Sequence, residues 1–144
     1  PRHARYNEDE SLLYIVTEYS NEVIVVKMYD FTIGQRISTI PNYQGTSYGA
    51  TLVFTADYKY LFVSNRGEDT IAKFKVLENG LLEYSHSFSC GGRHPRHMII
   101  SSDGKYLLSC NKNSNNVTII DIIFEEIVAD IKFRSPSGIV ELVD

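Results

Sequence analysis

The sequence predicts an all-β protein: a β-propeller fragment of three four-stranded blades plus one strand of a further blade. The first observation behind this prediction is a repeat. Similar segments start near residues 1, 48, 95 and 136, at intervals of 47, 47 and 41 residues. A period of about 40–50 residues is typical of propeller blades. The second observation is that each period contains short apolar segments separated by turn residues, as expected for β-strands.

The first repeat, residues 1–47, contains apolar segments at residues 13–17 and 23–28, which we expect to form strands. The latter segment is almost continuously apolar. A strand with one face in water alternates apolar and polar residues, whereas a continuous apolar run indicates burial on both faces. Blades stacked around an axis bury both faces of their sheets, so this third observation also favours the propeller.

The second repeat, residues 48–94, contains apolar segments and turns in the same order as the first repeat. A turn at Thr55-Ala56-Asp57 precedes a strand at residues 60–66, and a further strand follows from Asp69-Thr70 onward. Asn79-Gly80 is a tight-turn pair, because both residue types reach positive φ easily, and it predicts a hairpin.

The third repeat, residues 95–135, contains a second such pair, Asp103-Gly104. Residues 125–130 also fit a short helix, but their position in the repeat favours a strand. The start of a fourth repeat at Pro136 predicts a closing strand within residues 136–144. The four strands expected in the third repeat, from the innermost to the outermost, are Arg96–Ser101, Lys105–Cys110, Asn116–Ile122 and Glu126–Phe133.

Short antiparallel strands with regular turns also occur in sandwiches and barrels. Those folds do not require one segment to recur at a fixed spacing, so the repeat favours the propeller. Closed propellers have about four to eight blades. We therefore expect residues 1–144 to form one partial propeller domain, whose remaining blades come from the same parent chain or from another copy.

The composition argues against several classes of function. Apolar residues make up 43% of the 144 residues, charged residues 22%, and the formal net charge is −4. These values are typical of a globular chain without a basic surface for nucleic acid. No apolar run is long enough to span a membrane, and the first residues lack a signal-peptide pattern. We therefore expect a cytoplasmic protein without nucleic-acid or membrane partners.

Cys90 and Cys110 are predicted to be free thiols, because two cysteines make neither a disulfide framework nor a metal cluster. No pair of histidines or cysteines has ligand spacing with a supporting carboxylate. Gly91-Gly92 precedes a strand and predicts a turn, not a phosphate-binding loop. We expect neither a metal nor a cofactor.

Five stretches of the sequence resemble a known family. They are Pro1-Arg2-His3, residues 17–23, residues 60–67, His94-Pro95-Arg96-His97 and residues 102–107. Together they resemble the seven-bladed β-propeller lactonase family, which includes bacterial 6-phosphogluconolactonase of the propeller type and the fungal carboxymuconate-lactonizing enzyme. The resemblance covers nearly the whole chain and corresponds to the C-terminal part of the family fold, namely its last three blades and the closing strand.

The resemblance implies a lactone hydrolase that acts on a sugar lactone, most of all 6-phosphogluconolactone, without a cofactor. It places the family's catalytic residues on Arg2, Glu18 and Arg66 and implies a further histidine from an earlier blade. Two alternatives stay open. One is a carboxymuconate-type lactonizing enzyme, whose diacid substrate would suit the same arginines. The other is a non-catalytic propeller fragment that binds a ligand or protein.

Charged residues and histidines recur at equivalent positions of the repeats, which in a ring point to the same end of the axis. Glu18, Arg66 and Lys112 lie at the end of the second strand of each repeat. Arginine binds phosphate or carboxylate through a bidentate fork, so a convergent group of cations predicts a site for a small anionic lactone. The starts of two innermost strands carry the remaining members of this group, Arg2, His3, Arg96 and His97.

Two interpretations of these residues remain open. In the catalytic one, Glu18 activates a water molecule and an arginine stabilises the oxyanion, although neighbouring arginines would lower the pKa of Glu18 and weaken it as a base. In the structural one, the side chains fasten blades through hydrogen bonds to backbone carbonyls. The catalytic set is Arg2, Glu18 and Arg66. The expected substrate-binding set is His3, Arg96, His97 and Lys112, and the structural interpretation has more weight for the last three.

Overall fold

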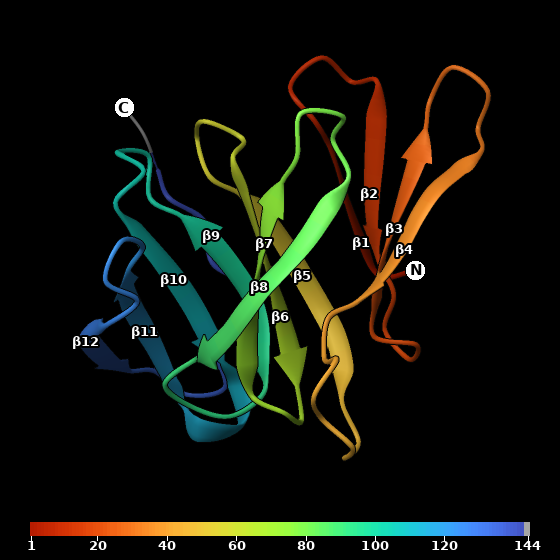
Figure 1. Ribbon diagram of the computed structural model, residues 1–144. Helices are drawn as coiled ribbons and strands as arrows, with labels where there is room; N and C mark the ends of the chain where they lie inside the picture. Colours follow the sequence, from red (N-terminus) through yellow and green to blue (C-terminus); the bar gives the residue numbers. More distant parts are fainter. Residues whose placement is uncertain (143–144) are drawn as a thin grey trace.

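The computed structural model describes residues 1–142, which form three four-stranded antiparallel sheets standing side by side (Figure 1). Blade 1 consists of β1 (His3–Tyr6), β2 (Leu12–Val16), β3 (Glu22–Lys27) and β4 (Ile33–Ser38). Blade 2 consists of β5 (Tyr48–Phe54), β6 (Tyr60–Arg66), β7 (Thr70–Val76) and β8 (Leu82–Ser89). Blade 3 consists of β9 (Pro95–Ile100), β10 (Tyr106–Asn111), β11 (Asn116–Asp121) and β12 (Ile127–Lys132).

The strands follow one another in sequence order within each sheet, and the innermost strand β5 lies against both β1 and β9. This arrangement confirms the predicted propeller blades. Each end of the four strands expected in the third repeat is correct to within one residue. A short 3-10 turn, η1 (Lys112–Ser114), is the one helical element in residues 1–142. No helix in that range is long and apolar enough to cross a membrane.

The closing strand expected at residues 136–144 is not formed in the described part of the chain. Residues 136–142 belong to no sheet, and residues 143 and 144 lie outside the described residues. Each innermost strand of the three blades pairs with the second strand of its own blade. A closing strand would need a partner in a further blade, so it stays a prediction. The segment lies beside blade 3 instead, where the backbone N–H and the hydroxyl of Ser102 donate to the Glu141 carboxylate at 2.7 and 2.8 Å.

An aspartate shapes the hairpin between the first two strands of each blade. Asp9, Asp57 and Asp103 each accept the backbone N–H two residues further on, at 3.0, 3.1 and 3.1 Å. This contact forms an Asx turn. The residue after each aspartate has a positive φ: Glu10 (59°), Tyr58 (54°) and Gly104 (72°). The first two turns therefore lack the glycine that marks the third one in the sequence.

The core consists of apolar layers between neighbouring blades. Between blades 1 and 2 it includes Tyr14, Leu52 and Phe74, and between blades 2 and 3 it includes Phe62 and Met98. Fully burying a large apolar side chain contributes roughly 1.5–3 kcal/mol. Blade 2 has a neighbour on each side, and residues 61–66 of β6 are all buried.

The end blades are covered on one side only within the described chain. In β3 the fully buried Val23 and Val25 therefore alternate with half-buried neighbours, although the sequence is almost continuously apolar. On β12, Ile127, Val128 and Ile131 remain 48%, 55% and 49% exposed. The apolar runs predicted that both faces of every blade are buried. Within the described chain, this holds for blade 2.

Polar side chains also fasten the blades through backbone groups. The Gln35 amide donates to Leu82 O at 2.8 Å and accepts from Leu82 N at 2.7 Å, which joins β4 to β8. Asn65, next to the end of β6, donates to Thr39 O at 3.1 Å. Asn111, at the equivalent position of blade 3, donates to Cys90 O at 3.1 Å. Each of these asparagines therefore holds the linker that enters its own blade.

Candidate functional site

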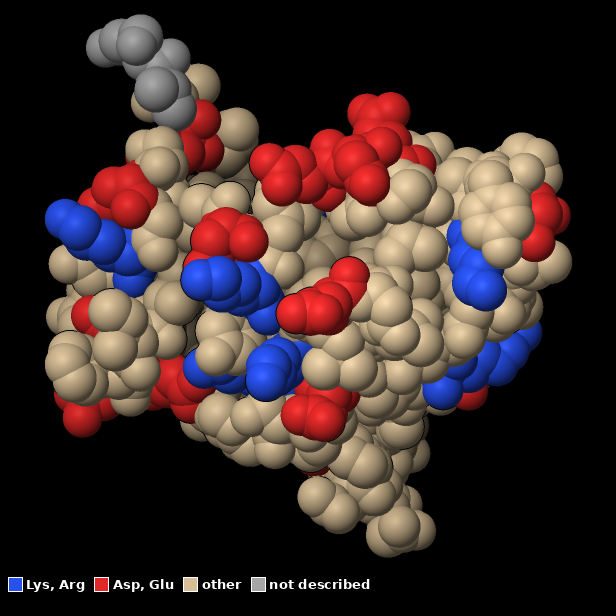
Figure 2. Space-filling model, turned by 45° about the horizontal axis from the view of Figure 1, so that its top comes forward, with Lys and Arg blue, Asp and Glu red and all other residues tan. Residues whose placement is uncertain are grey.

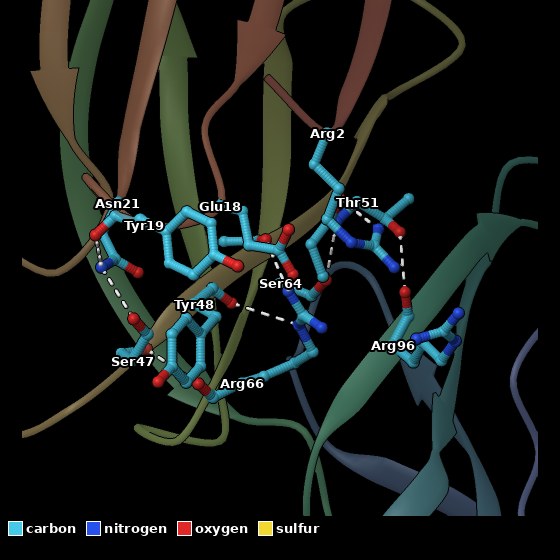
Figure 3. A network of polar contacts seen from close by, with 12 residues as sticks. Arg2, Glu18, Tyr19, Asn21, Ser47, Tyr48, Thr51, Ser64, Arg66 and Arg96 are labelled. Carbon is cyan, nitrogen blue, oxygen red and sulfur yellow. Dashed lines mark hydrogen bonds and ion pairs between the residues drawn. The ribbon is translucent and has the colours of Figure 1, made fainter.

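An ion pair between blades 1 and 2 forms the centre of the candidate site (Figure 3). Glu18 follows β2, and Arg66 is the last residue of β6. The guanidinium Nη2 of Arg66 donates to Glu18 Oε1 at 2.5 Å. The Arg66 side chain is 7% exposed, whereas that of Glu18 is 33% exposed. The pair therefore lies at the border between the protein interior and solvent, and the catalytic role of its two members stays a prediction.

Backbone carbonyls of β5 fix the guanidinium of Arg66. Its Nε donates to Tyr48 O at 3.4 Å, and its Nη2 also donates to Gly49 O at 3.2 Å. The Tyr48 ring lies 5.9 Å from the guanidinium carbon. These contacts use Nε and Nη2, and Nη1 has no hydrogen bond to the part of the chain that the structure describes.

A close approach of two backbones at Gly49 brings the two halves of the ion pair together. The Gly49 N–H donates to Glu18 O at 3.0 Å. A Cβ atom on Gly49 would lie 2.4 Å from the Thr17 carbonyl oxygen, so a side chain cannot be placed there without moving a backbone. A glycine is needed where backbones approach this closely. Gly49 thus sets the distance between the end of β2 and the start of β5.

Arg2 and Arg96 extend the site toward blade 3. Arg2 precedes β1, and its Nη1 donates to Ala50 O at 2.7 Å. Burial lowers the pKa of Arg2, as do the positive charges of Arg66 and Arg96, while Glu18 opposes them. Three arginines and one carboxylate therefore influence one another at this end of the blades, and the positive excess favours an anion.

His3 and His97 bind backbone groups of the following segment in equivalent ways. The Nδ1 atom of His3 accepts the N–H of Leu52 at 3.2 Å, and Nδ1 of His97 accepts the N–H of Ile139 at 3.3 Å. Burial lowers the pKa of His3 to about 4, with smaller effects from Arg5 and His97. A neutral imidazole can accept such a bond. These contacts favour the blade-fastening interpretation, and contact with a substrate stays a prediction.

Lys112 lies at a second group of residues, around His94. Its backbone N–H donates to His94 O at 3.1 Å. Burial lowers the pKa of His94 and the positive charge of Lys112 adds to this effect, whereas the charges that act on Glu18 are those of Arg66, Arg2 and Arg96. The sequence predicted no functional role for His94, which precedes a proline in a loop. Nothing in the sequence marks the feature that distinguishes it, a φ of 63° at the entry to β9.

The two ends of the blades differ in charge. Beside Glu18 lies a cavity of about 400 Å³, lined by Pro1, Thr17, Glu18, Tyr19 and Ser20. At the opposite end, where the hairpins face the viewer in Figure 2, a cavity of about 330 Å³ includes Glu8, Asp9 and Glu78 in its lining. Carboxylates repel an anionic ligand, so the end with Glu18 and the arginines is the better candidate.

Arg66 controls the ionisation of Glu18. The hydrogen bond from Arg66 lowers the pKa of the Glu18 carboxyl, assisted by the charges of Arg66, Arg2 and Arg96 and opposed by burial. Glu18 is therefore a weak base but a stable hydrogen-bond acceptor. Its contact with Arg66 uses Oε1, which leaves Oε2 to accept a hydrogen bond from a water molecule.

Replacing Glu18 with glutamine should destabilise the protein in a pH-dependent way. Because folding lowers the pKa of Glu18, its stabilising effect is present above the unfolded value of 4.5 and is lost as the pH falls through the folded value. The difference in unfolding free energy between the native protein and Glu18→Gln should shrink from about pH 7 to about pH 3 in denaturant titrations.

Glu83→Gln is the matched control for this measurement, because Glu83 is exposed on β8. Its effect on stability should be small throughout the range. A Glu18→Gln effect that stays constant from neutral to acidic pH would contradict the role assigned to the ion pair.

Within residues 1–142, no group of three or more His, Cys, Asp or Glu side chains is placed to hold a metal ion. Cys90 and Cys110 are both free and buried, as predicted. Burial raises the pKa of Cys90 to about 12, so this thiol stays protonated at neutral pH.

Comparison with known proteins gives a consistent result. Residues 1–128 match a family model described as "Lactonase, 7-bladed beta-propeller". The 6-phosphogluconolactonase of Bacillus subtilis is 32% identical over 128 residues, which cover 84% of this chain and 36% of that protein. The chain thus spans about a third of the length of this curated relative.

Solved structures agree with the sequence match. The periplasmic gluconolactonase of Pseudomonas aeruginosa superimposes with a TM-score of 0.84 at 28% identity, over 96% of this chain and 41% of that one. A protein from Lactobacillus plantarum gives a TM-score of 0.87 at 24% identity, over 95% and 43% of the two chains, and this likeness concerns the fold alone.

Proposed function

Because the chain belongs to the lactonase family of seven-bladed β-propellers, we propose that the protein hydrolyses a sugar lactone, 6-phosphogluconolactone in particular. The names of the Bacillus subtilis relative and of the Pseudomonas aeruginosa neighbour support this substrate class. The observation that carries the proposal is the Glu18–Arg66 ion pair, whose carboxylate lines the 400 Å³ cavity and whose charges act on Arg2.

Two arginines stabilise the charge that develops during hydrolysis. A water oxygen attacks the lactone carbonyl carbon, and the carbonyl oxygen becomes an oxyanion. The free Nη1 of Arg66 and the guanidinium of Arg2 donate hydrogen bonds to it. The bond between the carbonyl carbon and the ring oxygen then breaks, and the ring oxygen takes up a proton. Preorganised donors of this kind typically contribute about 100- to 1000-fold each to the rate.

Glu18 holds Arg66 in position and orients the attacking water through Oε2. Its lowered pKa makes it a poor acceptor of the proton that this water loses. Efficient general bases have a pKa near the working pH. We therefore assign the proton to a group outside the three blades, which agrees with the histidine that the family resemblance places in an earlier blade.

Further blades complete the site in this proposal. Glu18, Arg66 and Arg2 lie near the inner edges of the sheets, and the cavity beside Glu18 is lined by residues of blade 1 and the segment before it. The chain spans 36% of its Bacillus subtilis relative. Additional blades, from the same parent chain or from another copy, would close the ring around this end and enclose the substrate.

Lactone hydrolysis by the complete propeller, with all the blades that the proposal requires, tests the proposal. Proton release should be measured with 6-phosphogluconolactone, gluconolactone and a muconolactone, after subtraction of the spontaneous rate. We expect kcat/KM to be highest for the phosphorylated sugar lactone. Glu18→Gln should lower kcat more than it raises KM, while Glu83→Gln has no effect. Preference for the muconolactone would favour the lactonizing alternative, and no rate above the spontaneous one with any substrate would refute lactone hydrolysis.

A further inference from the structure

A second cavity lies next to Arg66, between blades 2 and 3. It has a volume of about 310 Å³ and is lined by Gly67, Asp69, Arg93, His94 and Asn113. A hollow of this size has room for a phosphate group. Gly67 directly follows Arg66 in the chain. The cavity and the reaction site therefore share one loop.

One carboxylate oxygen ties the two sides of this cavity together. Asp69 Oδ1 accepts the N–H of Gly67 at 3.0 Å and the N–H of His94 at 2.8 Å. These bonds connect the loop after β6 with the loop before β9. Because this oxygen already accepts two donors, its ability to repel a bound anion is reduced.

The turn after β10 fixes the other side. Lys112 N donates to His94 O, and Asn113 N donates to Arg93 O, both at 3.1 Å. The N–H of Arg93 in turn donates to the Ser114 hydroxyl at 2.7 Å. The loop is thus held in place before a ligand arrives, although His94 has a φ of 63°, which costs of the order of 1–3 kcal/mol for a residue other than glycine. Preorganisation of this kind is typical of ligand sites.

The charges around the cavity favour an anion. Among residues 1–142, no carboxylate forms an ion pair with the side chain of Arg93, which is exposed. Burial lowers the pKa of His94, and the positive charges of Arg66 and Lys112 lower it further against the opposing charge of Asp69. The field at this imidazole is therefore positive.

We propose that this cavity binds the phosphate group of the substrate. Arg93 supplies the fork, the Asn113 amide and the His94 imidazole supply further donors, and the lactone ring extends from there toward Arg66. The inference rests on the proposed function, because it assigns the two ends of one substrate to adjacent parts of one site. It makes Arg93 the residue that distinguishes a phosphorylated sugar lactone from the same lactone without phosphate.

A binding experiment tests the subsite without catalysis. Histidine C–H signals of the full chain should be followed by NMR during titration with inorganic phosphate, 6-phosphogluconate and gluconate. The first two should shift the His94 signal and raise its pKa, because a dianion stabilises the imidazolium, whereas gluconate should not. Arg93→Gln should weaken phosphate binding at least about 10-fold, while Arg36→Gln, an exposed arginine on β4, should leave it unchanged. If the chemical shift of the His94 signal does not change when phosphate is added, the proposal is wrong.

Kinetics separate this inference from the proposed function. Arg93→Gln should raise KM for 6-phosphogluconolactone about 10-fold and leave gluconolactone hydrolysis unchanged. Equal effects of Arg93→Gln on both lactones, or none on either, would refute the phosphate subsite while lactone hydrolysis stands. Conversely, phosphate binding at His94 in a protein that hydrolyses neither lactone would support the subsite and refute the proposed function.

Discussion

Replacing Arg66 with lysine should lower kcat/KM for the sugar lactone by about 100-fold or more while the protein still folds. Lysine keeps the positive charge and can still reach Glu18. It cannot at the same time donate to Tyr48 O, Gly49 O and a substrate oxygen, as the planar guanidinium does through Nε, Nη2 and Nη1. The loss should appear mainly in kcat, because the developing oxyanion is where this donor acts.

The measurement is a steady-state comparison with Arg36→Lys, an exposed arginine on β4 that pairs with Glu22 at 3.6 Å. This control should keep full activity, because Arg36 lies on β4, the outermost strand of blade 1, and exposed ion pairs contribute little to stability. An Arg66→Lys protein with unchanged kcat/KM but a lower unfolding midpoint would show that Arg66 only fastens the blades. The catalytic interpretation of the ion pair would then fail.

Replacing Gly49 with alanine should destabilise the protein by about 3 kcal/mol, at the upper end of overpacking effects. The added Cβ would lie 2.4 Å from Thr17 O and 2.8 Å from a Val16 methyl carbon. Since Thr17 O belongs to the backbone, no rotation of a side chain relieves the first contact. Blades 1 and 2 must move apart, which also separates Glu18 from Arg66 and should reduce turnover together with stability.

Gly138→Ala provides the control, because a Cβ atom on Gly138 meets nothing within 4 Å. Denaturant unfolding should show no change for this variant and a clear decrease for Gly49→Ala. A Gly49→Ala protein with native stability would mean that the blades accommodate the methyl group. In that case the close backbone approach would not be what sets the geometry of the ion pair.

The blades could be predicted from the sequence because the patterns that indicate their strands and turns are local and are repeated. Apolar segments, the aspartates of the hairpin turns and a spacing of 41 to 47 residues recur along the chain, so three weak patterns support one another. Residues 136–142 resemble the start of a further blade but belong to no sheet among the described residues. An apolar segment becomes a strand only when a partner strand is present, and a local pattern does not show whether the partner exists.

The site could be predicted only in part, for a similar reason. Equivalent repeat positions pointed to Glu18, Arg66 and Lys112, and the structure pairs the first two but places the third beside His94. The repeat defines the end of the blade on which a residue lies. It does not define which neighbouring residue its side chain reaches, because long side chains can turn toward either adjacent blade.

The sequence by itself therefore determined the three blades and the end of the blades at which Glu18 and Arg66 lie. The tertiary structure alone decided that Glu18 meets Arg66 across a backbone contact at Gly49 and that Asp69 joins two loops around His94. The physical reason is distance along the chain. Glu18 and Arg66 are 48 residues apart, and Asp69 and His94 are 25 apart, so only the packing of one blade against the next brings these groups within hydrogen-bond range.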